Sequence, residues 1–336
     1  MQIGFFDIED RQNRLSELGD NLEALDTVID WNMFLPVIKK ALQKEHKGQG
    51  GRPPFDYIMM FKILILQRYY NLSDEQTEYQ ITDRISFMRF LKLGLYDKVP
   101  DARTIWHFKN ELAQQKVSDK LFNQFESMLE AKQLIAHKGS IVDATFVDVP
   151  KQHNTPDDKE TIKEGKVPEE WSDKKKAHKD TDARMTKKRD EYHFGYKNHI
   201  VMDAISKFIT AYLFTPANIP DFKSIPSFAG RMDSDLWADS AYNVKPVHEQ
   251  LIREGIEPHL LKRNTKCHKI SDDDRKENTE KSRIRVRVEH AFGFIKSTMN
   301  GINQRSIGKV RNEFNVGLTN LLYNMCRYEF LQRTQG

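Results

Sequence analysis

The order of the segments after residue 140 is the feature that most constrains the fold. Three stretches rich in β-branched residues follow one another there, at residues 140–149, 193–203 and 208–214. Their composition and partial period-two alternation predict strands. Helical and strand-like segments then alternate toward the end of the chain. Three consecutive strands followed by alternating elements predict an α/β fold, with a mixed sheet flanked by helices.

The segments that follow the third strand are expected to be a helix, a strand, a helix, a strand and two long helices, at residues 221–229, 235–238, 244–254, 257–261, 278–300 and 313–330. This order matches a ribonuclease H-like core. The first two strands are separated by residues 151–191, which are polar and rich in lysine, with Trp171 as the exceptional large apolar residue. Such a segment cannot bury a core of its own, so we expect a long mobile excursion.

The first 135 residues read as helices. Residues 56–70 are dense in apolar side chains, which predicts a buried helix. Ser73 and Gln76 have the spacing of a capping box, which favours a helix over residues 73–81. Asp101 precedes a helical stripe in residues 103–114, and Ser118 is expected to cap the helix that follows it. An all-helical domain over residues 1–135 is therefore expected to precede an α/β domain over residues 136–336.

Composition narrows the class of protein only a little. A chain of 336 residues accommodates two domains, and no run of about 18 apolar residues indicates a membrane span. Cys267 and Cys326 are far apart, which fits a reducing cytoplasm and not a disulfide scaffold. A net charge of +4 hardly favours nucleic acid over other partners. Basic residues crowd positions 174–189 and 262–287, and either run alone is typical of a solvated face.

Two aspartates stand at strand positions where a carboxylate has to be explained. Asp143 lies in IVDATFVDVP, and a charge inside such a strand must be paired, bound to metal or exposed at an edge. Asp239 lies in LWADSAYN, at the carboxyl end of a short strand, where ligands of α/β sheets gather. A solvent-facing acid and a helix cap are the ordinary alternatives for these two positions. Asp148 and Asp203 are rival acids, which we rank lower because they lie near a strand end and a turn.

A third acid lies in the segment KSRIRVRVEHAFGFIKS. Helical geometry would place Arg285, Glu289 and Lys296 on nearly one line, because they are four and seven residues apart. About 100° around the axis lies an apolar stripe that would pack on the sheet; its members are Ile284, Val288, Phe292, Ile295 and Met299. The alternative is a surface ion pair between Arg285 and Glu289, worth a few tenths of a kcal/mol.

Taken together, the three acids indicate metal-dependent phosphoryl transfer. A small set of carboxylates can hold two divalent ions that activate an attacking oxygen and stabilise the leaving one. Mg²⁺ needs few protein ligands, because it keeps waters or takes phosphate oxygens. Adjacent arginine and lysine side chains would then bind the phosphodiester backbone. The sequence contains no zinc-ligand spacing, P-loop or Ser-His-Asp arrangement.

At this point the chain resembles bacterial insertion-sequence transposases with a DDE catalytic core, in the branch that contains insertion sequence five. The stretch that begins GGRPPFDYIMMFKILILQRYYNLSDEQ, followed by PDARTIWHFKNEL, is similar to the helical N-terminal region of that branch. The catalytic half then matches in order, with IVDATFVDVP, HFGYKNHIVMD, TPANIPD, LWADSAYN and RIRVRVEHAFGFIK. Each motif is weak alone, and the ordered series covers most of the chain.

The resemblance implies a ribonuclease H-like catalytic domain in which Asp143, Asp239 and Glu289 bind metal. Two Mg²⁺ ions are the implied cofactors, with Mn²⁺ able to substitute. Arg285 and Lys296 match the family's Tyr-Arg-Glu-Lys signature, and would hold DNA phosphates near the scissile bond. The chain departs from that signature at the tyrosine, because position 282 is a serine. The short spacing between Asp239 and Glu289 also leaves no room for the large β-rich insertion of some relatives, which disfavours excision through a hairpin.

The partners follow from the same resemblance. Double-stranded DNA is expected, both as the terminal inverted repeats of the element and as target DNA. Lys197 and His199, which alternate on the strand beside that of Asp143, are expected near the substrate. The helices of residues 1–135 would bind the DNA ends, for example by a helix-turn-helix that uses residues 103–114, or would form a packing or dimerisation bundle. A homodimer or higher oligomer in the bacterial cytoplasm, associated with the nucleoid, is expected because two ends must be handled together.

Two other functions remain compatible with the sequence. A ribonuclease H-like nuclease or resolvase would share the metal chemistry and cut strands without joining them. A domesticated DNA-binding protein would have no catalytic activity, although clustered carboxylates that repel phosphate argue against that function. Inverted repeats and short target duplications around the reading frame would favour an active mobile element.

Overall fold

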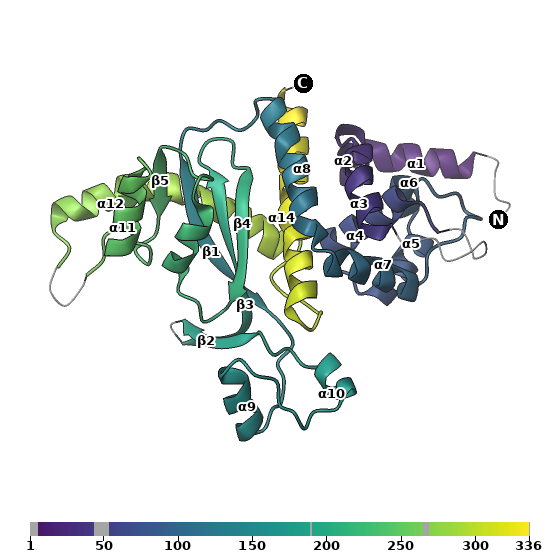
Figure 1. The fold of residues 1–336 in the computed structure, drawn as a ribbon. Helices are drawn as coiled ribbons and strands as arrows, with labels where there is room; N and C mark the ends of the chain where they lie inside the picture. The colour runs from purple at the N-terminus through teal and green to yellow at the C-terminus, as the bar shows by residue number, and fades with distance from the viewer. Residues whose placement is uncertain (1–5, 44–53, 189, 265–268, 336) are drawn as a thin grey trace. The chain divides into compact units, whose positions relative to one another are not determined.

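The computed structural model describes residues 6–43, 54–188, 190–264 and 269–335 (Figure 1). Cys267 lies outside the described residues. The chain forms two compact units, one of residues 1–124 with 321–336 and the other of residues 125–320. The boundaries fall inside two helices, α8 (Val117–Ala131) and α14 (Lys309–Gln335).

The described residues of the first unit are helical, as the sequence predicts. In chain order the helices before α8 are α1 (Asp7–Glu17), α2 (Asn21–Val28), the 3₁₀ turn η1 (Trp31–Phe34), α3 (Leu35–Leu42), α4 (Tyr57–Tyr69), α5 (Asp74–Asp83), α6 (Ile85–Leu91) and α7 (Ala102–Gln114). Ser73 and Gln76 form the predicted capping box at the start of α5, and Asp101 caps α7 through the Thr104 amide. The prediction for Ser118 is wrong, because α8 begins one residue earlier and places Ser118 inside its first turn.

Helix α4 is the centre of the first unit. Every residue from Met60 to Arg68 is buried, which agrees with the continuous apolar run that predicted it. Lys62 is buried among them, and its ammonium group pairs with Asp26 and donates to the Phe90 carbonyl at 2.8 Å. A buried charge is tolerated only with such partners. None of the described helices is long and apolar enough to span a membrane.

In its described residues, the second unit is built on a mixed six-stranded sheet. Its strands are β1 (Ser140–Asp148), β2 (Arg184–Lys188), β3 (Glu191–Asp203), β4 (Ile209–Pro216), β5 (Asp235–Ala238) and β6 (Glu257–Leu260). Strand β1 pairs antiparallel with β3 and parallel with β5, β6 pairs parallel with β5, and both β2 and β4 pair with β3. This order, with one antiparallel strand beside a central parallel set, is that of a ribonuclease H-like sheet and confirms the predicted fold class.

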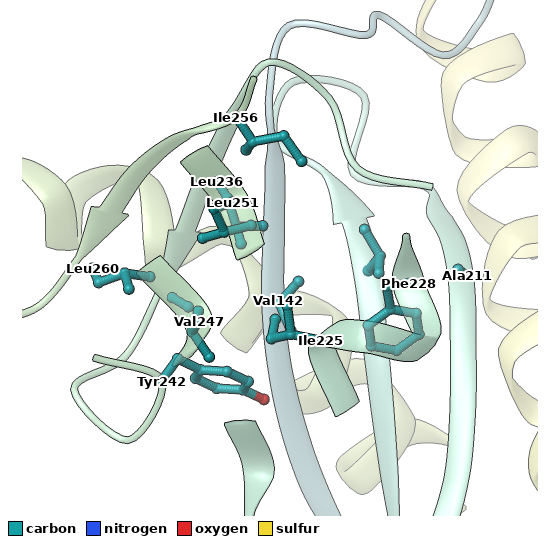
Figure 2. Close-up of a cluster of buried hydrophobic side chains, with 12 residues drawn as sticks. Val142, Ala211, Ile225, Phe228, Leu236, Tyr242, Val247, Leu251, Ile256 and Leu260 are labelled. Carbon is teal, nitrogen blue, oxygen red and sulfur yellow. The ribbon is translucent and has the colours of Figure 1, made fainter. Parts of the chain in front are cut away.

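The two faces of the sheet bury different sets of side chains. Val142 and Leu236 point to one face, which packs on the 3₁₀ segment η2 (Asp221–Phe228) and on α11 (Lys245–Arg253) (Figure 2). On the opposite face, Val147 packs with Val316 of α14. Asn198 of β3 and Asn320 of α14 exchange amide hydrogen bonds on this face, at 2.8 and 3.2 Å. Because side chains alternate along a strand, Asp143 belongs to the face that α14 covers.

Two predicted helices differ from the structure. Residues 221–228 form a 3₁₀ segment, because Pro226 lies inside it and lacks the amide that an α-helix needs. Residues 272–298 are not one continuous helix. They form α12 (Asp272–Arg285), α13 (Arg287–Gly293) and a π-helical turn, η3 (Phe294–Thr298), with the break at Val286.

The segment between the first two predicted strands is structured, which corrects the expectation of a mobile excursion without a core. It contains α9 (Pro156–Lys163), α10 (Asp173–Ala177) and β2, and lies below the sheet in Figure 1. Trp171 is buried, and its indole N–H donates to Asp158 at 2.8 Å. The ammonium groups of Lys175 and Lys179 lie 4.7 and 5.7 Å from its ring centroid. The buried apolar side chains of the segment are few, with Ile162, Trp171 and Ala183 among its described residues, and lysine side chains cover the Trp171 ring.

Candidate active site

Two of the predicted acids lie side by side where the pairing between two neighbouring strands ends. The parallel ladder of β1 and β5 ends at the pair Val142 and Ala238, so Asp143 and Asp239 are the next residues on the two chains. Strand β1 continues in its pairing with β3, where Asp143 lies opposite Ile200, whereas the chain leaves the sheet at Asp239. The carboxylate of Asp239 accepts the Ala241 amide at 2.6 Å, which holds it at the start of that turn. The two strands thus separate where the two carboxylates stand.

Arg285 connects the third acid to this place. Its guanidinium nitrogen Nη1 lies 3.2 Å from Asp143 Oδ2, and Nη2 lies 3.1 Å from Glu289 Oε1. The ion pair with Glu289 is the one that the sequence offered as an ordinary alternative, and the bond to Asp143 shows that it does not stand alone on a solvated helix. Val288 and Phe292 bury the apolar side of α13, which keeps Glu289 at the margin of the sheet. The structure thereby brings Asp143, Arg285 and Glu289 into one cluster.

The environment of Asp143 disfavours its charge. The pKa of Asp143 is raised to about 7, chiefly by burial and to a smaller extent by the negative charges of Asp239 and Glu289, whereas the Ala144 amide and Arg285 act to lower it. The amide of Ala144 donates to Asp143 at 2.8 Å. A buried carboxyl group whose pKa lies near neutrality is characteristic of functional sites.

Lys296 does not lie in the predicted row with Arg285 and Glu289. It belongs to the π-helical turn η3, whose extra residue per turn shifts the phase of the helix after α13. Its side chain is exposed, with the ammonium group 5.9 Å from the centroid of the Phe292 ring. The straight row was wrong because it assumed 3.6 residues per turn from Arg285 to Lys296.

Lys197 and His199 lie away from Asp143, on the opposite face of the sheet. Antiparallel pairing places Ile200 directly opposite Asp143, so the odd-numbered positions of β3 point to the other side. The ammonium group of Lys197 bonds to Asp221 and to the Ile219 carbonyl, both at 2.7 Å. These contacts give no support to the expectation that Lys197 approaches the substrate.

His199 is fully buried and bonds through Nε2 to the hydroxyl of Thr215 at 2.8 Å. Burial lowers the pKa of His199 to about 4, which favours the neutral ring. A neutral, buried imidazole does not suit binding of a phosphate, so the contacts do not support DNA binding by His199 either.

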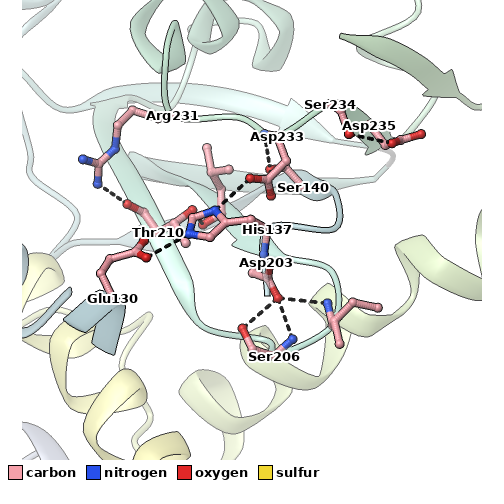
Figure 3. A network of polar contacts seen from close by, with 12 residues as sticks. Glu130, His137, Ser140, Asp203, Ser206, Thr210, Arg231, Asp233, Ser234 and Asp235 are labelled. Atoms are coloured by element: carbon pink, nitrogen blue, oxygen red, sulfur yellow. Dashed lines mark hydrogen bonds and ion pairs between the residues drawn. The ribbon is translucent and has the colours of Figure 1, made fainter. Parts of the chain in front are cut away.

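The two rival acids have other partners. Asp148 lies on the same strand as Asp143, five residues further along. Its Oδ1 lies 3.3 Å from Nδ1 of His193. Asp203 is buried and accepts the Ile205 and Ser206 amides and the Ser206 hydroxyl, so it closes the turn after β3 (Figure 3). Both arrangements account for the acid without a metal.

The donor set fits a divalent ion, although the side chains do not already enclose one. Among the described residues, no three His, Cys, Asp or Glu side chains are close enough together to form a ready-made metal site. Asp143, Asp239 and Glu289 offer the carboxylate oxygens that hard divalent ions prefer, and a guanidinium already lies between two of them. Glu289 has a half-exposed side chain, at 51%, and its described ion pair is the one with Arg285.

Sequence reasoning missed the role of Asp221, which it treated only as the start of a helix. Lys197 lies in a buried stretch of β3 and therefore requires an acidic partner. The segment TPANIPD follows β3 and β4 in the sequence, and its Asp221 is that partner. It also missed the ion pair between Arg285 and Asp143, which joins residues 142 positions apart. No local pattern announces a contact over that separation.

Two family models match this chain, and two solved structures are similar to it over most of its length. The model of the family described as "Transposase DDE domain" matches residues 136–325, and that of "Transposase domain (DUF772)" matches residues 9–111. A cryo-EM structure of the piggyBac transposase synaptic complex with hairpin DNA is 10% identical, with 94% of this chain and 74% of that chain covered, at a TM-score of 0.43. A crystal structure of a pre-cleavage Mos1 transpososome is 10% identical, with 88% and 83% covered, at a TM-score of 0.19.

The sheet order defines the class as ribonuclease H-like, with acidic residues where the pairing of two neighbouring parallel strands ends. The chain belongs to the transposase DDE domain family, whose model covers more than half of its length. It is therefore an insertion-sequence DNA transposase, an enzyme that cleaves DNA and transfers strands in a reaction that depends on divalent metal. The family match does not distinguish the branch of insertion sequence five from others.

Proposed function

We propose that Asp143, Asp239 and Glu289 are the acidic triad of this transposase. The observation that carries the proposal is the Arg285 guanidinium, which joins Asp143 of β1 to Glu289 of α13 beside the end of β5. Burial is the main cause of the raised pKa of Asp143, and the negative charges of Asp239 and Glu289 add to it, so all three carboxylates act on one another electrostatically. Acids that served only to stabilise the fold would not be brought together in this way.

Two Mg²⁺ ions, for which Mn²⁺ can substitute, are the proposed cofactors. When bound, such ions lower the pKa of an attacking water or hydroxyl and neutralise charge on the leaving oxygen. Asp143 and Asp239 would be the principal ligands, because Asp143 lies within a paired strand and Asp239 directly follows one. Glu289, from a more exposed helix, would complete the set by rotation of its side chain.

Arg285 and Lys296 are the proposed contacts to DNA phosphates near the scissile bond. A guanidinium recognises two oxygens of one phosphate, whereas an exposed ammonium group acts as a point charge. Arg285 is held at the acidic cluster by two ion pairs, and Lys296 is exposed on the turn that follows α13. The placement of Lys197 and His199 gives them no part in this proposal.

The proposed reaction is hydrolysis at the ends of the element, followed by attack of the freed 3′-hydroxyls on target DNA. The substrates would be terminal inverted repeats and a target duplex, handled by a homodimer or higher oligomer, because two ends must react together. Residues 1–135 would form a DNA-end-binding or oligomerisation domain, and residues 136–336 the catalytic domain with its insertion at about 151–191. The match of residues 9–111 to a transposase domain supports the first assignment, and the motif order supports the branch of insertion sequence five.

The test is strand cleavage and joining on DNA that carries the element's own end. Wild type would be compared with Asp143→Ala, Asp239→Ala and Glu289→Ala, in Mg²⁺, in Mn²⁺ and with chelator. Asp148→Ala is the matched control, because it removes an acid from the same strand as Asp143. The described side-chain partner of Asp148 is a histidine ring, that of His193. We expect metal-dependent cutting and joining in wild type and in Asp148→Ala, and DNA binding without reaction in the three triad variants.

Other outcomes would change the assignment. Cutting without joined products would favour the nuclease or resolvase function. Full activity in any one triad variant would remove that carboxylate from the site, and loss of activity in Asp148→Ala would bring the rival acid into it.

A further inference from the structure

The guanidinium of Arg285 holds the same carboxylate oxygens that a divalent ion would need. It bonds to Asp143 Oδ2 at 3.2 Å and to Glu289 Oε1 at 3.1 Å. Its side chain is only 18% exposed, so these ion pairs are partly shielded from water. An arginine stays protonated at any working pH, so it cannot release the carboxylates by losing its charge. A divalent ion that binds both oxygens has to compete with it.

Arg285 is also incompletely satisfied in this position. Its Nε atom is buried and has no hydrogen-bond partner among the described residues. A buried donor without a partner carries a free-energy cost, because it has lost its hydrogen bonds to water and has gained none in the protein. A phosphate group offers a guanidinium two oxygens in the geometry of its fork, which includes Nε, and so satisfies what the carboxylates leave unpaired. The side chain thus has a second anionic partner that suits it better.

We propose that Arg285 couples metal binding to DNA binding by moving between these two partners. Paired with Asp143 and Glu289, it competes with divalent ions for the acidic triad. Paired with a DNA phosphate, it leaves both carboxylates free for metal. DNA therefore tightens metal binding, and metal tightens DNA binding by the same factor, since coupling between two sites is reciprocal. The inference rests on the proposed role of Asp143, Asp239 and Glu289 as ligands.

The consequence is an enzyme that is poorly loaded with metal until DNA is present. Between encounters with DNA, the guanidinium neutralises part of the negative charge of the triad, which would otherwise repel phosphates. On DNA, the same positive charge moves to the backbone and the divalent ions take its place at the carboxylates. Metal-dependent cleavage is in this way confined to the bound complex.

The test measures Mn²⁺ binding directly, by the electron paramagnetic resonance signal of free Mn²⁺, on the full chain. The DNA is a blunt duplex copied from the sequence that flanks the gene, with 3′-deoxy ends that cannot be joined. For wild type we expect Mn²⁺ affinity to rise with DNA, within the range of about 5- to 150-fold that is usual for coupled sites. For Arg285→Gln we expect tighter Mn²⁺ binding without DNA, about tenfold, and little further effect of DNA.

Two further variants make the result specific. Arg283→Gln removes an exposed arginine of the same helix that forms no ion pair in the described part of the chain, and should bind Mn²⁺ as wild type does. Arg285→Lys keeps the charge without the fork, and should retain the competition with Mn²⁺ while losing most of the effect of DNA. It also keeps the test open if Arg285→Gln fails to fold, which circular dichroism would reveal.

Failure of the coupling and failure of the proposed site give different results. Equal Mn²⁺ affinity of wild type with and without DNA would overturn the coupling, as would weaker binding by Arg285→Gln. Asp143→Asn should lose high-affinity Mn²⁺ binding under all conditions. Unchanged binding by Asp143→Asn would instead overturn the assignment of the triad, whatever Arg285 does.

Discussion

Replacement of Asp143 by asparagine should make the protein more stable while it destroys the proposed metal site. Asparagine has nearly the shape of the carboxyl group and carries no charge. Burial and two neighbouring acids raise the pKa of Asp143 from 3.8 to about 7. Above pH 7 the folded protein therefore holds a charge that the unfolded chain carries more easily. The side chain is only 17% exposed, so solvent screens this cost weakly.

The magnitude follows from linkage. Each pH unit between the unfolded and the folded pKa is worth about 1.4 kcal/mol, so a rise of about three units costs about 4 kcal/mol at pH 8. Because the pKa is higher in the folded protein, the folded protein binds the proton at a higher pH than the unfolded chain does. Stability from this group is complete below pH 3.8 and is lost as pH rises through about 7. At pH 5 only the first part of that window has been crossed, so the cost is smaller, about 1 to 2 kcal/mol.

The assay is urea unfolding with chelator at pH 5 and pH 8, followed by hydrogen exchange of peptides from β1 and β3. Exchange in these strands reports on the unit that contains Asp143. Asp143→Asn should be more stable than wild type, by more at pH 8 than at pH 5. Asp235→Asn is the control of opposite sign, since the hydrogen bond from His259 lowers the pKa of Asp235 and its replacement should destabilise at pH 8. A stability difference for Asp143→Asn that is flat with pH, or negative at pH 8, would refute the reasoning.

Three further predictions concern the scaffold. Gly195→Ala should lower the free energy of unfolding by about 3 kcal/mol, because the φ of Gly195 is +149° and a Cβ there would lie 2.2 Å from a carbonyl oxygen of β1. Gly165→Ala is the control, with open space around the new Cβ, and should lower it by about 1 kcal/mol in the same thermal unfolding experiment. His137→Gln should lower the melting temperature at pH 6 and not at pH 9. Hydrogen bonds to Glu130 and Asp233 raise the pKa of His137 to about 8. The protonated, half-exposed ring contributes about 1 kcal/mol to stability, and this contribution is lost as pH rises through that pKa. Trp171→Ala should make residues 151–188 susceptible to limited proteolysis while β1 and β3 stay protected. Cleavage of that segment at the same rate in wild type and variant would show that it does not depend on the Trp171 ring.

The elements that the sequence predicted well are those whose pattern is local. The residues of β5 match their prediction from one end to the other, because a short apolar run between turns has few other structures available. Asp101 and the capping box at Ser73 also act over three residues, and both are present. The local pattern alone did not predict that Asp143 and Asp239 are neighbours; the family resemblance implied that they lie together, and the parallel pairing of β1 with β5 places them on adjacent strand positions.

The features that sequence reasoning missed depend on contacts between distant segments. The π-helical turn at Phe294–Thr298 is followed by Gly301, whose amide donates to the Ile295 carbonyl, and a Cβ at Gly301 would lie 2.8 Å from the Thr319 side chain of α14. The chain is thus closely packed against α14 just after the turn that contains Lys296. Periodicity within residues 278–300 contains no information about α14, so an ideal helix was the best local prediction.

The geometry of the sheet explains why the acid at position 143 is both costly and useful. Its strand is paired on both sides up to Val142, and beyond that point only β3 continues beside it. Asp143 therefore stands at the first position where one edge of β1 is open, with backbone packed on the other side. A residue fully inside the sheet would be unreachable, and one on a loop would ionise without cost and be held less firmly. The same intermediate position raises its pKa and leaves its oxygens accessible to a cation, so instability at this residue is inseparable from its capacity to bind one.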